Sequence, residues 1–190
     1  TVCELLGIRH PIVQGPFGGG LSTVELASTV SAMGGLGSYG AHALPAGRIE
    51  EVAAQIRART GAPFALNLWI SDHDPGGLAL SAEAFDSAYA LFEPWFRELG
   101  VAKPEMPERY HPSYALQIEA LLAARPPVFS FVFGIPEARV LDECRRLGIV
   151  TIGAATSIAE AEALDGAGVD LIVATGGEAG GHRPSFLQPA

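Results

Sequence analysis

The sequence predicts an α/β fold built on a parallel sheet. Short apolar segments alternate six times with segments of helical periodicity along the 190 residues. Helices of about 10–15 residues between successive strands imply parallel pairing through right-handed crossovers. The expected strands are apolar on both faces, as in VDLIVAT at residues 169–175, which is typical of strands with helices on one side and a core on the other.

Local signals define each element in turn. Residues 11–17 form the first expected strand, and Ser22 opens the first helix through its capping-box spacing to Glu25. Gly34 and Gly35 end that helix. The other strands are expected at residues 36–41, 63–70, 127–134, 149–154 and 169–175. The other helices are expected at residues 45–60, 113–125, 136–147 and 157–167, with one buried face in the first of these made by Ile49, Val52, Ala53 and Ile56.

One long segment, residues 71–112, interrupts this alternation. It holds a glycine-rich turn, a helix around residues 82–99 and a stretch punctuated by prolines. Connections of this length commonly cover or build a binding site. We therefore expect a single domain over residues 1–190 with an insertion at 71–112. An open doubly wound sheet could be complete with these strands, whereas a (β/α)8 barrel needs two more.

Charge and composition exclude several classes of function. The formal net charge is −9 and Lys103 is the sole lysine, so the basic surface that nucleic acid requires is missing. No apolar run approaches the ~18 residues of a membrane span, and residues 1–4 do not read as the start of a signal peptide. Cys3 and Cys144 have neither disulfide-framework nor zinc spacing, and Cys144 is expected to be a packed thiol. We expect a soluble, cytoplasmic protein without a metal.

Candidate site residues lie where the expected strands end. The turn QGPFGGG at residues 14–20 allows close approach of a ligand, although a plain turn between strand and helix has the same composition. Asn67 lies within an apolar strand and is either a satisfied core amide or a ligand contact. His182 lies in the glycine-rich loop GGEAGGHR, where an imidazole suits proton transfer near neutral pH. His42 could also face a site, but a solvated loop position is more common for such a residue.

Taken together, these stretches resemble the nitronate monooxygenases, formerly called 2-nitropropane dioxygenases, which are FMN-dependent (β/α)8 barrels. The resemblance rests on PIVQGP with the GGLG of residues 34–37, on NLW beginning at Asn67, on SFVFG at residues 130–134, and on AGVD followed by EAGGHR, which ends at Arg183. It implies an FMN-type (β/α)8 TIM barrel. About six βα units would be present, with the insertion after the third strand, and the barrel would continue beyond Ala190.

The resemblance also implies roles for individual residues. His182 corresponds to the catalytic base of the family. The residues implied to contact FMN are Gly15, Pro16, Phe17, Asn67, Thr175, Gly180 and Gly181. No metal is implied.

The implied activity is FMN-dependent oxidation of alkyl nitronates or nitroalkanes with O2 to a carbonyl compound and nitrite. One alternative is an FMN barrel that reduces enoyl-thioesters or quinones with NAD(P)H. A second alternative is a half-barrel subunit that binds without catalysis, because a fold does not guarantee a function. The expected partners are a small-molecule substrate and O2, with neither nucleic acid nor membrane, and a homo-oligomer is left open.

Overall fold

The computed structural model describes residues 1–70 and 81–187 of the chain. The chain divides into two compact units. One consists of Thr1–Asp72 together with Pro112–Ala190, and the other of His73–His111. The treatment of residues 71–112 as an insertion within one barrel domain stays a prediction.

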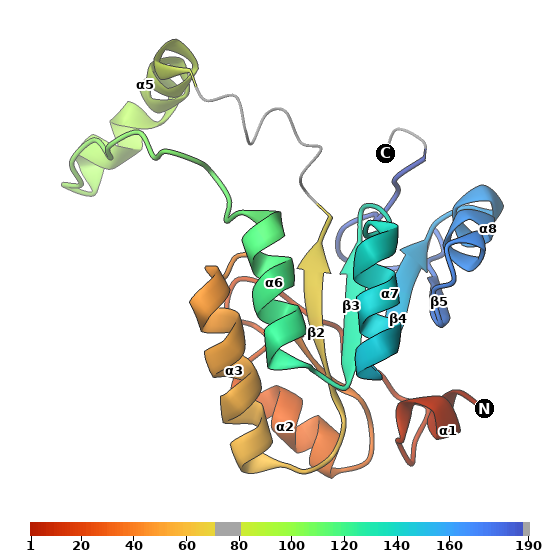
Figure 1. Cartoon of the computed structure of the whole chain (residues 1–190). Helices are drawn as coiled ribbons and strands as arrows, with labels where there is room; N and C mark the ends of the chain where they lie inside the picture. The colour runs from red at the N-terminus through yellow and green to blue at the C-terminus, as the bar shows by residue number, and fades with distance from the viewer. Residues whose placement is uncertain (71–80, 188–190) are drawn as a thin grey trace. The chain divides into compact units, whose positions relative to one another are not determined.

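The larger unit contains a sheet of parallel strands that follow one another in sequence order (Figure 1). Each strand pairs in parallel with the next, so the sheet has no reversal of strand order. The strands are β1 (Gly37–Gly40), β2 (Phe64–Trp69), β3 (Val128–Val132), β4 (Val150–Ala155) and β5 (Leu171–Ala174). This arrangement confirms the predicted α/β class, and the unbroken order is that of a barrel wall rather than of a doubly wound sheet.

Helices connect the strands and cover the outer face of the sheet. Their apolar side chains form one core with alternate residues of the strands, and the predicted face of Ile49, Val52, Ala53 and Ile56 is buried there. Most boundaries fall within two residues of the predicted ones, as at Gly148, whose φ of 71° caps a helix. The helices are α2 (Val24–Ala32), α3 (Ala46–Arg59), α6 (Tyr114–Ala124), α7 (Ala138–Leu147) and α8 (Ile158–Gly166).

Two predictions about the first unit were wrong in detail. Residues 11–17 form no extended strand, and their one bridge joins Val13 to Leu36 beside β1. Pro11 and Pro16 lack the N–H groups that a longer ladder would need. The N-cap of α2 is Thr23 rather than Ser22, because the Thr23 hydroxyl accepts from the N–H of Leu26 at 3.0 Å.

A short helix that the sequence analysis did not predict, α1 (Val2–Leu6), lies at the end where the strands begin (Figure 1). Leu6 and Ile8 pack there against inward-facing residues of several strands. Those partners are Leu36, Ala65, Val128 and Ile152. This cluster closes the amino-terminal end of the inner face, so the space left for a ligand is at the opposite end.

The smaller unit contains α5 (Ala82–Glu98), which buries none of its residues. Lys103 contacts this helix from the following segment. Its ammonium group pairs with Asp86 at 2.6 Å and lies over the rings of Phe85 and Tyr89. These are exposed contacts, which stabilise a fold by at most about 1 kcal/mol each.

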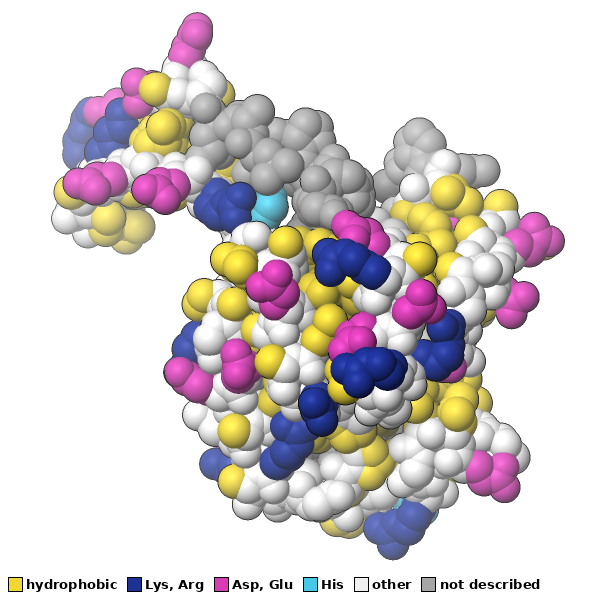
Figure 2. Space-filling view, in the orientation of Figure 1, with side chains coloured by type: hydrophobic (Ala, Val, Ile, Leu, Met, Phe, Trp, Pro, Cys, Tyr) yellow, Lys and Arg dark blue, Asp and Glu magenta, His cyan; other side chains and the backbone are white. Residues whose placement is uncertain are grey.

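The outer surface of α7 carries alternating charges (Figure 2). Arg145 pairs with Asp142 and Arg146 with Glu143, one helical turn apart.

Within residues 1–70 and 81–187, no helix has both the length and the hydropathy to cross a bilayer.

Gly37→Ala is expected to destabilise the larger unit by about 3 kcal/mol, the upper end of the usual cost of overpacking. A Cβ at Gly37 would overlap the backbone carbonyl of Ala27, where α2 crosses β1. Urea unfolding followed by circular dichroism measures the change. Gly47→Ala in α3 is the matched control, because nothing lies within 4 Å of its Cβ position. Equal stability of the two variants would show that α2 can shift freely on β1.

Candidate active site

A cavity of about 650 Å³ opens at the carboxyl ends of the strands in the larger unit. Its walls are mainly apolar side chains and glycines, with a few polar groups, which is the usual make-up of a small-molecule site. All eight residues singled out from the sequence line this one cavity. They are Gly15, Pro16, Phe17, Asn67, Thr175, Gly180, Gly181 and His182.

Gln14 fixes the turn that carries Gly15. Its side-chain amide donates to the carbonyl oxygens of Gly15 at 2.7 Å and Ser38 at 3.0 Å, and accepts from the N–H of Ser38. The buried Ser22 hydroxyl joins the same network, with the amide of Gln14 donating to it at 3.1 Å. Ser22 therefore supports the turn instead of capping the helix, and the first wall of the cavity is joined directly to β1.

Asn67 is a buried amide with a partner across the sheet. Asn67 on β2 and Ser130 on β3 are register partners, so their side chains leave the sheet on the same face. The Asn67 Nδ2 donates to Ser130 Oγ at 3.0 Å. Both residues line the cavity. The amide of Asn67 therefore has a hydrogen-bond partner within the protein and also borders the space that a ligand would fill.

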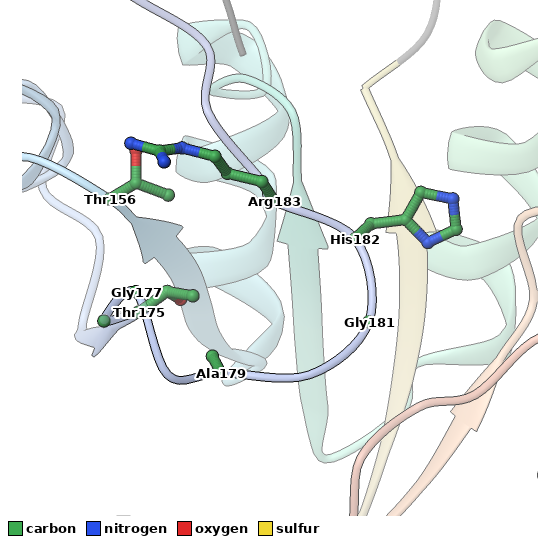
Figure 3. Close-up of a pocket in the computed structure, with 8 residues that line it drawn as sticks. Thr156, Thr175, Gly177, Ala179, Gly181, His182 and Arg183 are labelled. Carbon is green, nitrogen blue, oxygen red and sulfur yellow. The ribbon is translucent and has the colours of Figure 1, made fainter.

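The loop after β5 carries His182. It begins at Thr175, whose N–H donates to the carbonyl of Ala155 at 2.8 Å. Figure 3 shows the imidazole of His182 and the guanidinium of Arg183 extending to opposite sides of this loop, with Arg183 directed towards Thr156. A smaller cavity of about 190 Å³ lies on the Arg183 side and shares Thr175, Ala179, Gly181 and His182 with the larger one.

Glu160 holds the far end of the same loop. Its fully buried carboxylate accepts from the N–H groups of Phe186 at 2.7 Å and Leu187 at 3.1 Å, and from the N–H and hydroxyl of Thr156, both at 2.7 Å. Burial alone would raise the pKa of Glu160, but these donors outweigh it and lower the pKa to about 2. We call this arrangement the Glu160 clasp.

Aromatic rings line one side of the cavity, and two of them, Trp69 and Phe133, were not predicted from the sequence as site residues. The indole of Trp69 stacks on the imidazole of His42, with centroids 3.9 Å apart, and meets His182 at 5.1 Å. Phe133 lies edge-on to the same indole at 5.1 Å. The alternation of β2 could have indicated Trp69, because it lies two residues after Asn67 and shares its face.

Phe133 has a φ of 68°, in the left-handed region that bulky side chains rarely adopt. It directly follows β3 and directs its ring into the cavity wall. Such strain persists where surrounding contacts enforce it, and it gathers at functional sites.

Cys144, a nucleophilic residue outside this cavity, is buried in the core. Burial raises the pKa of the Cys144 thiol to about 11, and the nearby Asp170 and Glu143 add to the effect, so the thiolate is scarce near neutral pH. This confirms Cys144 as a packed thiol. Among the residues that the structure describes, no group of three or more His, Cys, Asp or Glu side chains could hold a metal.

Comparison with solved structures identifies the architecture. The nitroalkane oxidase of Streptomyces ansochromogenes matches with a TM-score of 0.81 and 31% identity, over 100% of this chain and 52% of that protein. FabK from Thermotoga maritima matches with a TM-score of 0.69 over 97% of this chain, and at 24% identity it supports the fold alone. A partial (β/α)8 barrel, as predicted, fits these matches.

Comparison with curated sequences agrees with the structural comparison. A probable nitronate monooxygenase of Staphylococcus haemolyticus is 34% identical over 184 residues, which is 97% of this chain and 50% of that protein. The chain therefore spans about half the length of the curated relatives it matches. The family model for nitronate monooxygenase matches residues 1–189. The chain belongs to the nitronate monooxygenase family.

Proposed function

We propose that this chain carries the flavin-facing part of an enzyme that oxidises alkyl nitronates and nitroalkanes with O2 to a carbonyl compound and nitrite. One observation carries the proposal: an imidazole, a buried amide and a glycine-rich turn, from three distant parts of the sequence, line one apolar cavity. Family membership supports the same reaction class.

The cavity suits FMN. Its volume of about 650 Å³ is within the range of small-molecule sites. At Gly15 a Cβ would lie 3.0 Å from the ring of Phe17, so a larger residue there would press on that ring in the cavity wall. The residues proposed to hold the flavin are Gly15, Pro16, Phe17, Asn67, Thr175, Gly180 and Gly181. When bound, FMN supplies the electron-accepting chemistry.

His182 provides the proton chemistry of the proposed site. A neutral nitroalkane must lose its α-proton before oxidation, and an imidazole is a suitable acceptor near neutral pH. A nitronate has already lost that proton and needs no base. The imidazole of His182 contacts the rings of Trp69 and Phe133 in the wall of the cavity, while the residue as a whole stays exposed and open to a substrate.

The intact protein is expected to purify yellow, with FMN that denaturation releases. Absorbance spectra and chromatography of the released flavin measure this, and anaerobic addition of an alkyl nitronate should bleach the visible band. A matched addition of NAD(P)H tests for the reductase alternative, which predicts bleaching by the nicotinamide and not by the nitronate. A colourless protein that takes up no added FMN would refute the proposal.

A further inference from the structure

The backbone at His42 is fixed from two sides. The N–H of Ala41 donates to the carbonyl of Asn67 at 2.9 Å. The side-chain amide of Gln117, on α6, donates to the carbonyls of His42 and Leu44, both at 2.8 Å. Gln117 is only 2% exposed, so this is a built connection and not a surface contact. The position of His42 is therefore set by β2 and by α6.

The imidazole of His42 is fixed as well. Its plane lies within 2° of the indole plane of Trp69, at a centroid separation of 3.9 Å. On another side it meets Gly18, where any Cβ would collide with the ring carbon Cε1. This is the close approach for which the turn needs glycine. The expectation that His42 is a solvated loop residue was wrong, because both contacts place the ring in the cavity wall.

The two ring nitrogens of His42 have different surroundings. Nδ1 is enclosed and has no hydrogen-bond partner among the described residues. Nε2 has no partner among those residues either, but it is not enclosed. Burial lowers the pKa of His42, and the nearby His182 lowers it further, so the neutral form of the ring is favoured.

A neutral imidazole carries one N–H, and the surroundings of the two ring nitrogens decide which of them holds the proton. Buried N–H groups without a partner are rarer than buried acceptors without one. The proton therefore belongs on Nε2, and the lone pair on the enclosed Nδ1. His42, which lines the cavity, then carries its single N–H on the ring nitrogen that is not enclosed.

We propose that His42 contacts the substrate and that its Nε2–H donates a hydrogen bond to an oxygen of the substrate nitro group. The inference rests on the proposed function. His42 and His182 both border the indole of Trp69, with centroid distances of 3.9 Å and 5.1 Å. A nitroalkane whose α-carbon reaches His182 therefore has its nitro group beside the same indole.

The chemistry of the nitro group matches this donor. Nitro oxygens accept hydrogen bonds and donate none. As the α-proton leaves for His182, negative charge accumulates on those oxygens, so a fixed donor stabilises the transition state more than the ground state. A neutral donor gives this stabilisation without repelling the imidazolium that forms on His182.

Three substitutions distinguish the effect of the Nε2–H donor from the effect of the ring that stacks on Trp69. His42→Phe keeps a ring to stack on Trp69 but has no donor. His42→Gln places an amide nitrogen near the position of Nε2, whereas His42→Asn places it near Nδ1. In the FMN-loaded intact protein we expect His42→Phe and His42→Asn to lower kcat/KM for a neutral nitroalkane about 10²-fold. His42→Gln should restore most of the loss, and FMN affinity should stay unchanged in all three.

A binding measurement tests the contact without turnover. The compound tert-nitrobutane has a nitro group but no α-hydrogen, so it can bind without reacting. Calorimetry should show about fivefold weaker binding to His42→Phe than to the wild type or to His42→Gln, which is the effect of one hydrogen bond.

The outcomes distinguish this inference from the proposed function. If His42→Phe retains both kcat/KM and affinity for tert-nitrobutane, the ring only packs on Trp69 and the inference is wrong. If the wild type turns over no nitroalkane while His42→Phe still weakens binding of tert-nitrobutane, the proposed function fails and the hydrogen bond to the nitro group stands.

Discussion

Replacing His182 by Asn is expected to lower kcat/KM for neutral nitroalkanes by about 10²–10⁴-fold, the usual contribution of a positioned base. Turnover of preformed nitronates should fall far less, because that substrate arrives without its α-proton. Steady-state kinetics with a nitroalkane and its own nitronate, at equal FMN saturation, measures the two effects separately.

His10→Asn is the matched control for this experiment, because His10 is exposed and does not line the cavity. It should leave both rates unchanged. Equal losses for nitroalkane and nitronate in His182→Asn would mean that His182 positions the substrate or holds its loop, and is not the base.

Glu160→Gln is expected to lower the free energy of unfolding by about 3 kcal/mol, the upper end of the usual contribution of a hydrogen bond to a charged group. One carboxylate oxygen accepts from Thr156 and the other from Phe186 and Leu187. An amide has only one acceptor, so either orientation turns its NH2 group towards N–H donors. Urea unfolding measures the loss, and hydrogen exchange at residues 186 and 187 reports release of the loop.

The contribution of the Glu160 clasp also has a defined pH dependence. The pKa of Glu160 is lower in the folded chain, at about 2, than its ordinary value of 4.5. The stabilisation is therefore complete above about pH 4.5 and is lost as the pH falls towards 2. Stability of the wild type should fall more steeply over this interval than stability of Glu160→Gln.

Glu162→Gln is the matched control for the clasp, because Glu162 is exposed on the same helix. It should change neither stability nor exchange at residues 186 and 187. If Glu160→Gln behaves like this control, the N–H groups of Phe186 and Leu187 find other acceptors and the clasp does not hold the loop.

The sequence was sufficient for most of the fold, because glycine, proline and apolar periodicity act locally. Gly148 ends α7 through its left-handed conformation, and Ser157 caps α8 by accepting from Glu160 N–H, so both boundaries are readable in the sequence. The choice between Ser22 and Thr23 as N-cap was not readable, because both are good caps and the network of Gln14 decides between them. The five residues of α1 are too few to show helical periodicity.

The site was predicted only in part, because only some of its residues give a local signal in the sequence. Glycine-rich turns and a histidine at strand ends are visible locally in the sequence, and the structure brings them to one cavity. Three other residues could not be recognised, because their places in the site are set by partners far along the chain or on the opposite side of a turn. They are Glu160, Trp69 and His42. Glu160 looks like any polar residue in the first turn of a helix until residues 186 and 187 return to it.

The link between Gln117 and the turn at His42 bears on how much change in length this chain tolerates between them. The helix that carries Gln117 begins just after the segment 71–112, yet its amide holds a turn that comes before that segment. A change in the length of the intervening stretch therefore leaves in place the hydrogen bonds that hold the turn at His42. The entropic cost of such a change is small, about 0.6 kcal/mol for each doubling of a flexible connection. The hydrogen bonds that fix this wall of the cavity and the length of the segment 71–112 can therefore change independently.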